Sequence, residues 1–143
     1  MPLRPDITLD KFLRRGVGYL PALIGVRFTG VVESRIDGEL DIRGELLAPN
    51  GYLHAASIIA LADTACGYGC LAHLPSGAEN FTTIELKSNF LGTVREGTIA
   101  CVATPAHLGN TTQVWDAVVS DKASGKKLAL FRCTQLVLWP RKA

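Results

Sequence analysis

The sequence lacks the cysteine and histidine spacings that a metal site or a disulfide framework requires. Its four cysteines stand at positions 66, 70, 101 and 133, and no two of them form a CxxC pair. Its three histidines, at positions 54, 73 and 107, also lack the spacing of metal ligands. We therefore expect no bound metal, and buried free thiols in a reducing compartment.

The sequence also has little excess charge and no apolar run long enough to cross a membrane. Its net charge of +2 is too small to predict nucleic acid or an anionic membrane surface as a partner. The most apolar stretch, residues 55–62, is followed by Asp63 well before it could span a bilayer. The first residues show no signal peptide. We expect a cytoplasmic protein that binds neither nucleic acid nor membrane.

What the sequence does have is the composition and length of one globular domain. With 48% hydrophobic and 20% charged residues, the 143-residue chain is expected to form a single domain over residues 1–143. Thr8 and the apolar residues after it predict a capped helix over about 8–18, which Pro21 prevents from resuming. Two strands, 24–36 and 39–47, are predicted on either side of an Asp37-Gly38 hairpin turn.

The centre of the chain predicts one helix, over about 54–73, that is apolar nearly all the way round and must be wrapped by other structure. Four more strands are predicted after it, separated by glycine, asparagine or aspartate: 81–90, 97–105, 112–121 and 127–139. Strands joined by consecutive hairpins pair in an antiparallel manner. The prediction is an α+β protein in which a curved antiparallel sheet wraps around one long apolar helix, the hot-dog fold.

Asp63 is the residue in this helix that most needs an explanation. An ionised carboxylate among apolar residues is costly unless it is paired or hydrogen-bonded. One interpretation is that Asp63 bonds to a neighbouring backbone or hydroxyl group. The other is that a reaction requires the carboxylate. The small residues Ala60 and Gly67, one turn away on the same face, are expected to leave room for a substrate.

The start of the helix provides a second candidate group. The first amides of a helix have no partner within it, and the helix dipole favours negative charge there. Ala55 and Ala56 are small enough to let a ligand oxygen approach these amides, which could stabilise the oxyanion of a thioester. Ala55 and Asp63 are eight residues apart, or roughly 12 Å along one helix. No acyl carbon can touch both, so the chemistry predicts a symmetric dimer with two composite sites.

Two segments of the helix resemble a known signature. Residues 53–56, LHAA, and 61–65, LADTA, resemble the HGG…LAD pattern of PaaI-type and 4-hydroxybenzoyl-CoA-type hot-dog thioesterases. Residues 84–91, 95–97 and 107–115 resemble later landmarks, so that the likeness covers about residues 24–139. The resemblance implies an acyl-CoA thioesterase, without a metal or other cofactor, that forms a homotetramer as a dimer of dimers.

The resemblance also implies roles for individual residues. Asp63 would be the nucleophile or the general base, the Ala55 amide would polarise the carbonyl, and His54 would lie near the thioester. Asn50 is the candidate to replace a polar residue of the family that falls on Ala48 here. The residues implied to contact substrate are Ala56, Gly67, Asn89, Gly109, Asn110, Thr111 and Thr112. The chain departs from the family where its double glycine is Ala55-Ala56 and where a hydroxyl one turn after the carboxylate falls on Gly67.

Several alternatives stay open at the level of sequence. His54 could be a capping residue rather than a catalyst, and Asn50 could belong only to a turn. A hydroxyacyl-thioester dehydratase fits poorly, because its histidine and carboxylate follow another local pattern. A non-catalytic acyl-CoA-binding module is the main rival, although binding alone gains little from a carboxylate that faces an acyl group. The acyl group is left open, as is the choice between nucleophile and base for Asp63.

Overall fold

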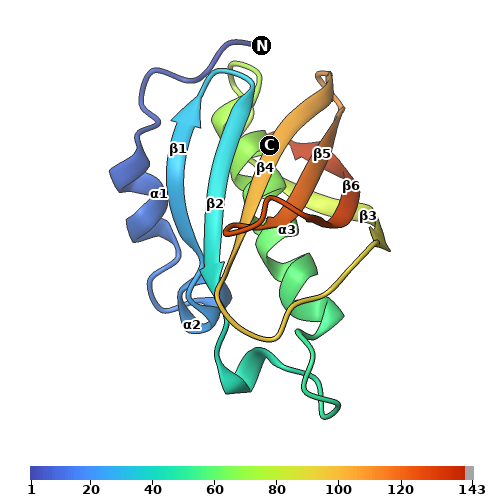
Figure 1. Cartoon of the computed structure of the whole chain (residues 1–143). Helices are drawn as coiled ribbons and strands as arrows, with labels where there is room; N and C mark the ends of the chain where they lie inside the picture. Colours follow the sequence, from blue (N-terminus) through green and yellow to red (C-terminus); the bar gives the residue numbers. More distant parts are fainter. Residues whose placement is uncertain (141–143) are drawn as a thin grey trace.

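A computed structural model describes residues 1–140 (Figure 1). One six-stranded antiparallel sheet, in the order β1-β2-β4-β5-β6-β3, packs on the long helix α3. The predicted α+β hot-dog fold is confirmed. That residues 1–143 form a single domain stays a prediction, and residues 141–143 lie outside the described part of the chain. In chain order the elements are α1 Leu9–Arg15, α2 Leu20–Ile24, β1 Arg27–Val32, β2 Arg35–Asp41, a 3-10 turn Gly44–Leu46, α3 Ala55–Ala72, β3 Asn80–Phe90, β4 Thr98–Leu108, β5 Thr112–Asp121 and β6 Lys127–Leu138.

Helix α3 is the core of the molecule. Its length and composition would let it cross a membrane, but 61% of it is buried inside the protein, as in a core helix. Small residues let the sheet approach this helix closely. A Cβ atom at Gly69 would lie 2.6 Å from the Trp115 ring of β5, so only glycine fits between helix and sheet at this point.

The N-terminal segment forms two short helices. Thr8 caps α1, because its side chain accepts a hydrogen bond from the Lys11 amide. The expectation that Pro21 prevents further helix was wrong, since Pro21 lies in the first turn of α2. The first turn leaves its N–H groups unpaired in any helix, so a proline costs no hydrogen bond there.

The first hairpin turns at a different place from the one predicted. Asp37 and Gly38 lie inside β2, and the turn that joins β1 to β2 contains Ser34. Ser34 has a φ of 62°, unusual for a residue with a side chain. Its N–H donates to Nε2 of His73 at 3.0 Å, which holds this conformation. Strand β2 also ends at Asp41 rather than at residue 47, and a 3-10 turn follows.

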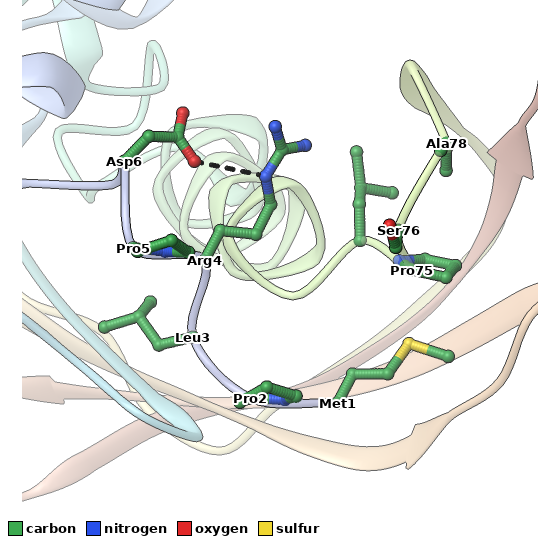
Figure 2. A pocket seen from close by; sticks show the side chains of 11 residues that line it. Met1, Pro2, Leu3, Arg4, Pro5, Asp6, Pro75, Ser76 and Ala78 are labelled. Atoms are coloured by element: carbon green, nitrogen blue, oxygen red, sulfur yellow. Dashed lines mark hydrogen bonds and ion pairs between the residues drawn. The ribbon is translucent and has the colours of Figure 1, made fainter.

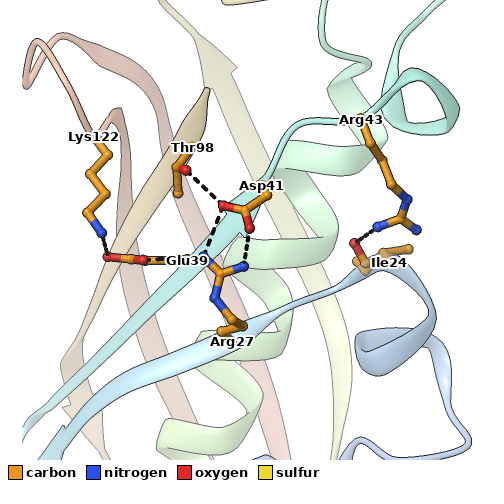
Figure 3. A network of polar contacts seen from close by, with 7 residues as sticks. All are labelled: Ile24, Arg27, Glu39, Asp41, Arg43, Thr98 and Lys122. Atoms are coloured by element: carbon orange, nitrogen blue, oxygen red, sulfur yellow. Dashed lines mark hydrogen bonds and ion pairs between the residues drawn. The ribbon is translucent and has the colours of Figure 1, made fainter. Parts of the chain in front are cut away.

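Polar side chains at the end of β2 link it to its two neighbours, β1 and β4 (Figure 3). Arg27 of β1 donates to both oxygens of Asp41, at 2.6 and 3.0 Å, and Thr98 of β4 donates to the same carboxylate at 2.7 Å. The hydrogen bond from Arg27 is the main cause that lowers the pKa of Asp41 to about 2. Because these groups are exposed, their contribution to stability is small.

His73, just past the end of α3, is fully buried and neutral. Its Nδ1 lies 2.8 Å from the Gly69 carbonyl oxygen, and its Nε2 accepts the hydrogen bond from Ser34. Burial lowers the pKa of His73 below its ordinary value. A proton on Nε2 would face the Ser34 N–H and break the contact that holds the first hairpin.

We therefore predict that the protein loses stability as the pH falls below about 6.5, the pKa of histidine in an unfolded chain. The folded state binds this proton less readily than the unfolded state, so the stabilising effect is complete above that pH and declines below it. Urea unfolding at pH 8, 7, 6 and 5 measures the change. A His73→Gln variant should flatten the decline, whereas the control His107→Gln, on an exposed residue, should not. A wild-type midpoint that stays constant from pH 7 to pH 5 would contradict this role.

Candidate active site

Asp63 lies in the third turn of α3, half-buried, next to the strand at the edge of the sheet. Thr83 of β3 donates a long hydrogen bond, 3.4 Å, to its Oδ1. Burial raises the pKa of the Asp63 carboxyl, and the hydrogen bond from Thr83 opposes that rise. Within residues 1–140 no lysine, arginine or histidine forms an ion pair with Asp63. The carboxylate thus contacts a hydroxyl group, as one interpretation of the sequence allowed, and it forms no ion pair with these residues.

Thr83 and Gln135 are neighbours of Asp63 that the sequence did not single out. They are paired across β3 and β6, and the Thr83 hydroxyl lies 2.9 Å from Oε1 of Gln135. Gln135 is fully buried, and its Nε2 donates to Sγ of Cys133 at 3.2 Å. A buried glutamine with both ends engaged is a fixed support for the hydroxyl group.

The start of α3 leaves one backbone amide free. His54 is the N-cap, and its Nδ1 accepts a hydrogen bond from the Ala56 amide at 2.9 Å. The Ser57 amide donates to the His54 carbonyl at 2.9 Å. The Ala55 N–H has no acceptor within the described residues, and Ala55 is exposed. The Ala55 amide is therefore the donor that a ligand oxygen can reach, and Ala56 is already engaged.

The loop before α3 is fixed by local contacts. Asn50 Oδ1 accepts a hydrogen bond from the Tyr52 amide at 3.2 Å, and Gly51 has a φ of 81°. The Arg95 guanidinium lies 4.2 Å from the centre of the Tyr52 ring. Asn50 thus forms the turn that the sequence allowed as an alternative, and a catalytic role for it stays a prediction.

The other predicted contact residues do not gather around Asp63 within one chain. The space expected beside Gly67 is filled, because a Cβ there would lie 2.9 Å from the Phe81 ring. Asn89 is exposed and pairs with the exposed Leu130, on the face of the sheet away from α3. The loop 109–112 joins β4 to β5 at the C-terminal end of α3, where Gln113 donates to the His73 carbonyl at 2.8 Å. Ala55 lies at the other end of α3, so this loop is far from the Ala55 amide of the same chain.

Two cavities also lie near the C-terminal end of α3 rather than at Asp63. One, of about 430 Å³, lies between residues 1–6 and residues 74–78, and Arg4 and Asp6 form an ion pair beside it (Figure 2). The other, of about 490 Å³, is lined by residues of α1 together with Leu71 and Glu79. Asp63 lines neither of them.

Other nucleophiles and metal ligands are poorly placed. All four cysteines are buried and free. Burial raises the pKa of Cys70 and of Cys101 to about 12, so these thiols stay protonated and unreactive at neutral pH. Among residues 1–140, no group of three or more histidine, cysteine or acidic side chains could hold a metal ion. Within the described residues, Asp63 and the Ala55 amide remain the two candidate reactive groups.

One of the two open edges of the sheet, that of β3, lies beside Asp63. Strand β3 is at the end of the sheet, so one side of it has no neighbouring strand within residues 1–140 (Figure 1). Ile84, Leu86 and Phe90 of this strand are 55%, 42% and 44% exposed. An open edge with apolar side chains is a site where another strand can pair. Ile59 and Ala60 of α3, close to Asp63 in sequence, are also only partly buried.

Comparisons with known proteins agree with this fold. The model of the thioesterase superfamily matches residues 50–127. The 1,4-dihydroxy-2-naphthoyl-CoA hydrolase of Escherichia coli is 26% identical over 135 residues, which are 92% of this chain and 96% of that protein. A variant of thioesterase PA1618 from Pseudomonas aeruginosa is 25% identical, with a TM-score of 0.90 over 96% of this chain and 99% of its own.

The PaaI protein of E. coli, from the phenylacetic acid degradation operon, shares the fold with a TM-score of 0.74. It is 23% identical, and the match covers 82% of this chain and 83% of that one. The family model covers more than half of the chain, including both Asp63 and Ala55. This chain belongs to the thioesterase superfamily of hot-dog proteins.

Proposed function

We propose that the protein is an acyl-CoA thioesterase that hydrolyses its substrate to a free acid and CoA. The observation that carries this proposal is the environment of Asp63, a half-buried carboxylate with a raised pKa that forms no ion pair with any residue in the range 1–140. Such a group is costly to maintain and has the properties of a general base or a nucleophile. The free amide of Ala55 supplies the complementary part, a donor for a developing oxyanion.

Both groups serve one reaction if two chains form a twofold dimer. Within one chain Ala55 and Asp63 stand about two turns of helix apart, roughly 12 Å. Antiparallel pairing of two β3 edges would bury the exposed Ile84 and Leu86 side chains and set two α3 helices side by side in opposite directions. Asp63 of one subunit would then face the Ala55 amide of the other. We extend the proposal to a homotetramer built from two such dimers.

In the proposed mechanism, the thioester carbonyl oxygen accepts a hydrogen bond from the Ala55 amide of one subunit. Asp63 of the other subunit attacks the carbonyl carbon to form a mixed anhydride, or it takes a proton from an attacking water. In both routes the C–S bond breaks, and the CoA thiolate leaves and is protonated. In the base route water provides the new oxygen of the acid. In the anhydride route water then hydrolyses the anhydride, which regenerates Asp63 and can leave an Asp63 oxygen in the acid. His54 holds the helix start by capping it. The buried thiols and the lack of a metal-binding cluster in residues 1–140 give no support to other nucleophiles.

The relatives support a CoA thioester as the substrate class. The E. coli relative is named as a hydrolase of an aromatic acyl-CoA. The chain covers nearly the whole length of that protein, and Asp63 lies inside the matched region. We further propose a cytoplasmic location, because free thiols persist in a reducing compartment.

A panel of aromatic, short-chain and medium-chain acyl-CoA thioesters tests the proposal. Release of free CoA, followed with a thiol reagent, should show turnover of at least one member of the panel. Binding of these thioesters, measured by calorimetry without any release of CoA, would favour the non-catalytic module instead. If the panel shows neither binding nor turnover, both the thioesterase and the binding module are contradicted.

A further inference from the structure

The side chains of α3 next to Asp63 do not donate a hydrogen bond to its carboxylate. One turn on is Gly67, which has no side chain, and the space above it is occupied by the Phe81 ring. The adjacent hydroxyl, that of Thr64, donates back to the Ala60 carbonyl at 2.6 Å. The side chain that can donate a hydrogen bond to Asp63, within residues 1–140, comes from β3 and is Thr83.

A bulge in β3 places this hydroxyl toward the helix. Thr83 pairs with the buried Gln135, but the next paired residue is Glu85, which pairs with Thr134 on the opposite face of β6. In a regular strand residues 83 and 85 would point to the same face. The bulge therefore directs Thr83 toward Asp63 and turns the Glu85 carboxylate to the outside, where it does not repel Asp63.

The hydroxyl of Thr83 has one proton and two possible acceptors. Its oxygen lies 2.9 Å from Oε1 of Gln135 and 3.4 Å from Oδ1 of Asp63. A hydroxyl can donate to one of them at a time, and a hydrogen bond to a charged acceptor is the stronger. When Asp63 is ionised, the proton of Thr83 can turn to it. When Asp63 is protonated, its own O–H can donate to Thr83, whose proton then goes to Gln135.

We propose that Thr83, supported by Gln135, is the positioning residue of Asp63 and provides from β3 the hydrogen bond that α3 does not. This inference rests on the proposed function and names the side chain that orients its carboxylate. The hydroxyl serves both protonation states of Asp63: it can donate to the carboxylate when Asp63 is ionised, and it can accept from the carboxylic acid when Asp63 is protonated.

The titratable side chains around Asp63 do not change charge in the pH range where Asp63 titrates, or they point away from it. The hydrogen bond from Thr83 is therefore the contact that opposes the effect of burial on the pKa of Asp63. The Cys66 thiol on α3 lies close enough to Asp63 to interact with its charge, and it also interacts with Cys133 on β6 and Cys101 on β4. Burial raises the pKa of Cys66 well above its ordinary value, so it stays neutral while Asp63 titrates. Glu85 of β3 points to the outer face of the sheet.

The test compares Thr83→Val, which keeps the shape and removes the hydroxyl, with Thr83→Ser, which keeps the hydroxyl. For the valine variant we expect kcat to fall roughly tenfold to a hundredfold, the cost of one hydrogen bond to a charged group, with KM nearly unchanged. The acid limb of its pH profile should move to higher pH, because the lost hydrogen bond had lowered the pKa of Asp63. The serine variant should stay within about threefold of wild type.

Thr82→Val is the matched control, since Thr82 is the exposed neighbour on the same strand and pairs with Leu136 on the other face. It should change neither kcat nor the acid limb. A Thr83→Val enzyme that keeps both its kcat and its acid limb would overturn the proposal.

A second readout does not depend on activity. The Asp63 carboxyl can be titrated by carbon-13 NMR, and its pKa should be higher in Thr83→Val than in wild type. If no thioester is hydrolysed but this difference is present, the proposed function fails while the contact stands. If the Asp63 pKa is the same in both proteins, Thr83 does not position the carboxylate.

Discussion

Replacing Asp63 by asparagine is expected to lower kcat/KM by a factor of roughly 10² to 10⁴ on any thioester that the wild type hydrolyses. The amide has nearly the same size as the carboxylate, but it can neither accept a proton from water nor attack a carbonyl carbon. Assays of CoA release with the best substrate of the panel measure the effect.

The loss should not arise from unfolding. Burial disfavours the charged form of Asp63 and raises its pKa, so an uncharged side chain at this position removes an unfavourable contribution. We expect the asparagine variant to melt at the wild-type temperature or above it at pH 7, and to keep its oligomeric state. Near-full activity in a folded Asp63→Asn protein would remove Asp63 from the mechanism.

Replacing Ala55 by proline is expected to lower kcat by roughly 10² to 10³. Proline has no N–H, so the substitution deletes the donor proposed to bind the oxyanion. Proline is well tolerated at the first position of a helix, where the amide has no partner in the helix. His54 before it has φ of −67° and ψ of 138°, a conformation suited to a residue that precedes proline.

The controls for this variant separate the amide from the side chain. Ala55→Gly keeps the N–H and should retain most of the activity, although it loosens the backbone. Circular dichroism should show wild-type helix content for both variants. Equal activity in the proline and glycine variants would mean that the Ala55 amide does not contact the reacting carbonyl.

The fold was predictable because its strongest patterns are local. The apolar run around Asp63 marked α3, and the strand predicted over residues 112–121 has the same bounds as β5. The first hairpin failed because its true turn depends on a contact between Ser34 and His73, which are distant in sequence. An Asp37-Gly38 pair is a strong turn signal, but here it lies in a paired strand.

The part of the site that was predictable from the sequence also depends on local patterns. Asp63 and Ala55 stood out as a charge in an apolar helix and as an amide at the start of a helix. Thr83 and Gln135 did not stand out, because they reach Asp63 only through the pairing of β3 with β6 and the bulge after Thr83. Gly67 was expected to open space for substrate, and the structure fills that space with Phe81 from another element.

The central claim is that Asp63 of one subunit works with the Ala55 amide of another. It is tested most directly by refolding Asp63→Asn and Ala55→Pro chains together. Each variant alone should be nearly inactive. In an equal mixture, half of all the dimers formed would contain one chain of each kind and therefore one intact site out of two.

The mixture should then recover about a quarter of the wild-type activity. Mixing Asp63→Asn with a chain that carries both substitutions restores no site and should stay inactive. If the first mixture, shown by mass spectrometry to contain mixed dimers, is no more active than its parents, the two groups do not meet across a twofold axis.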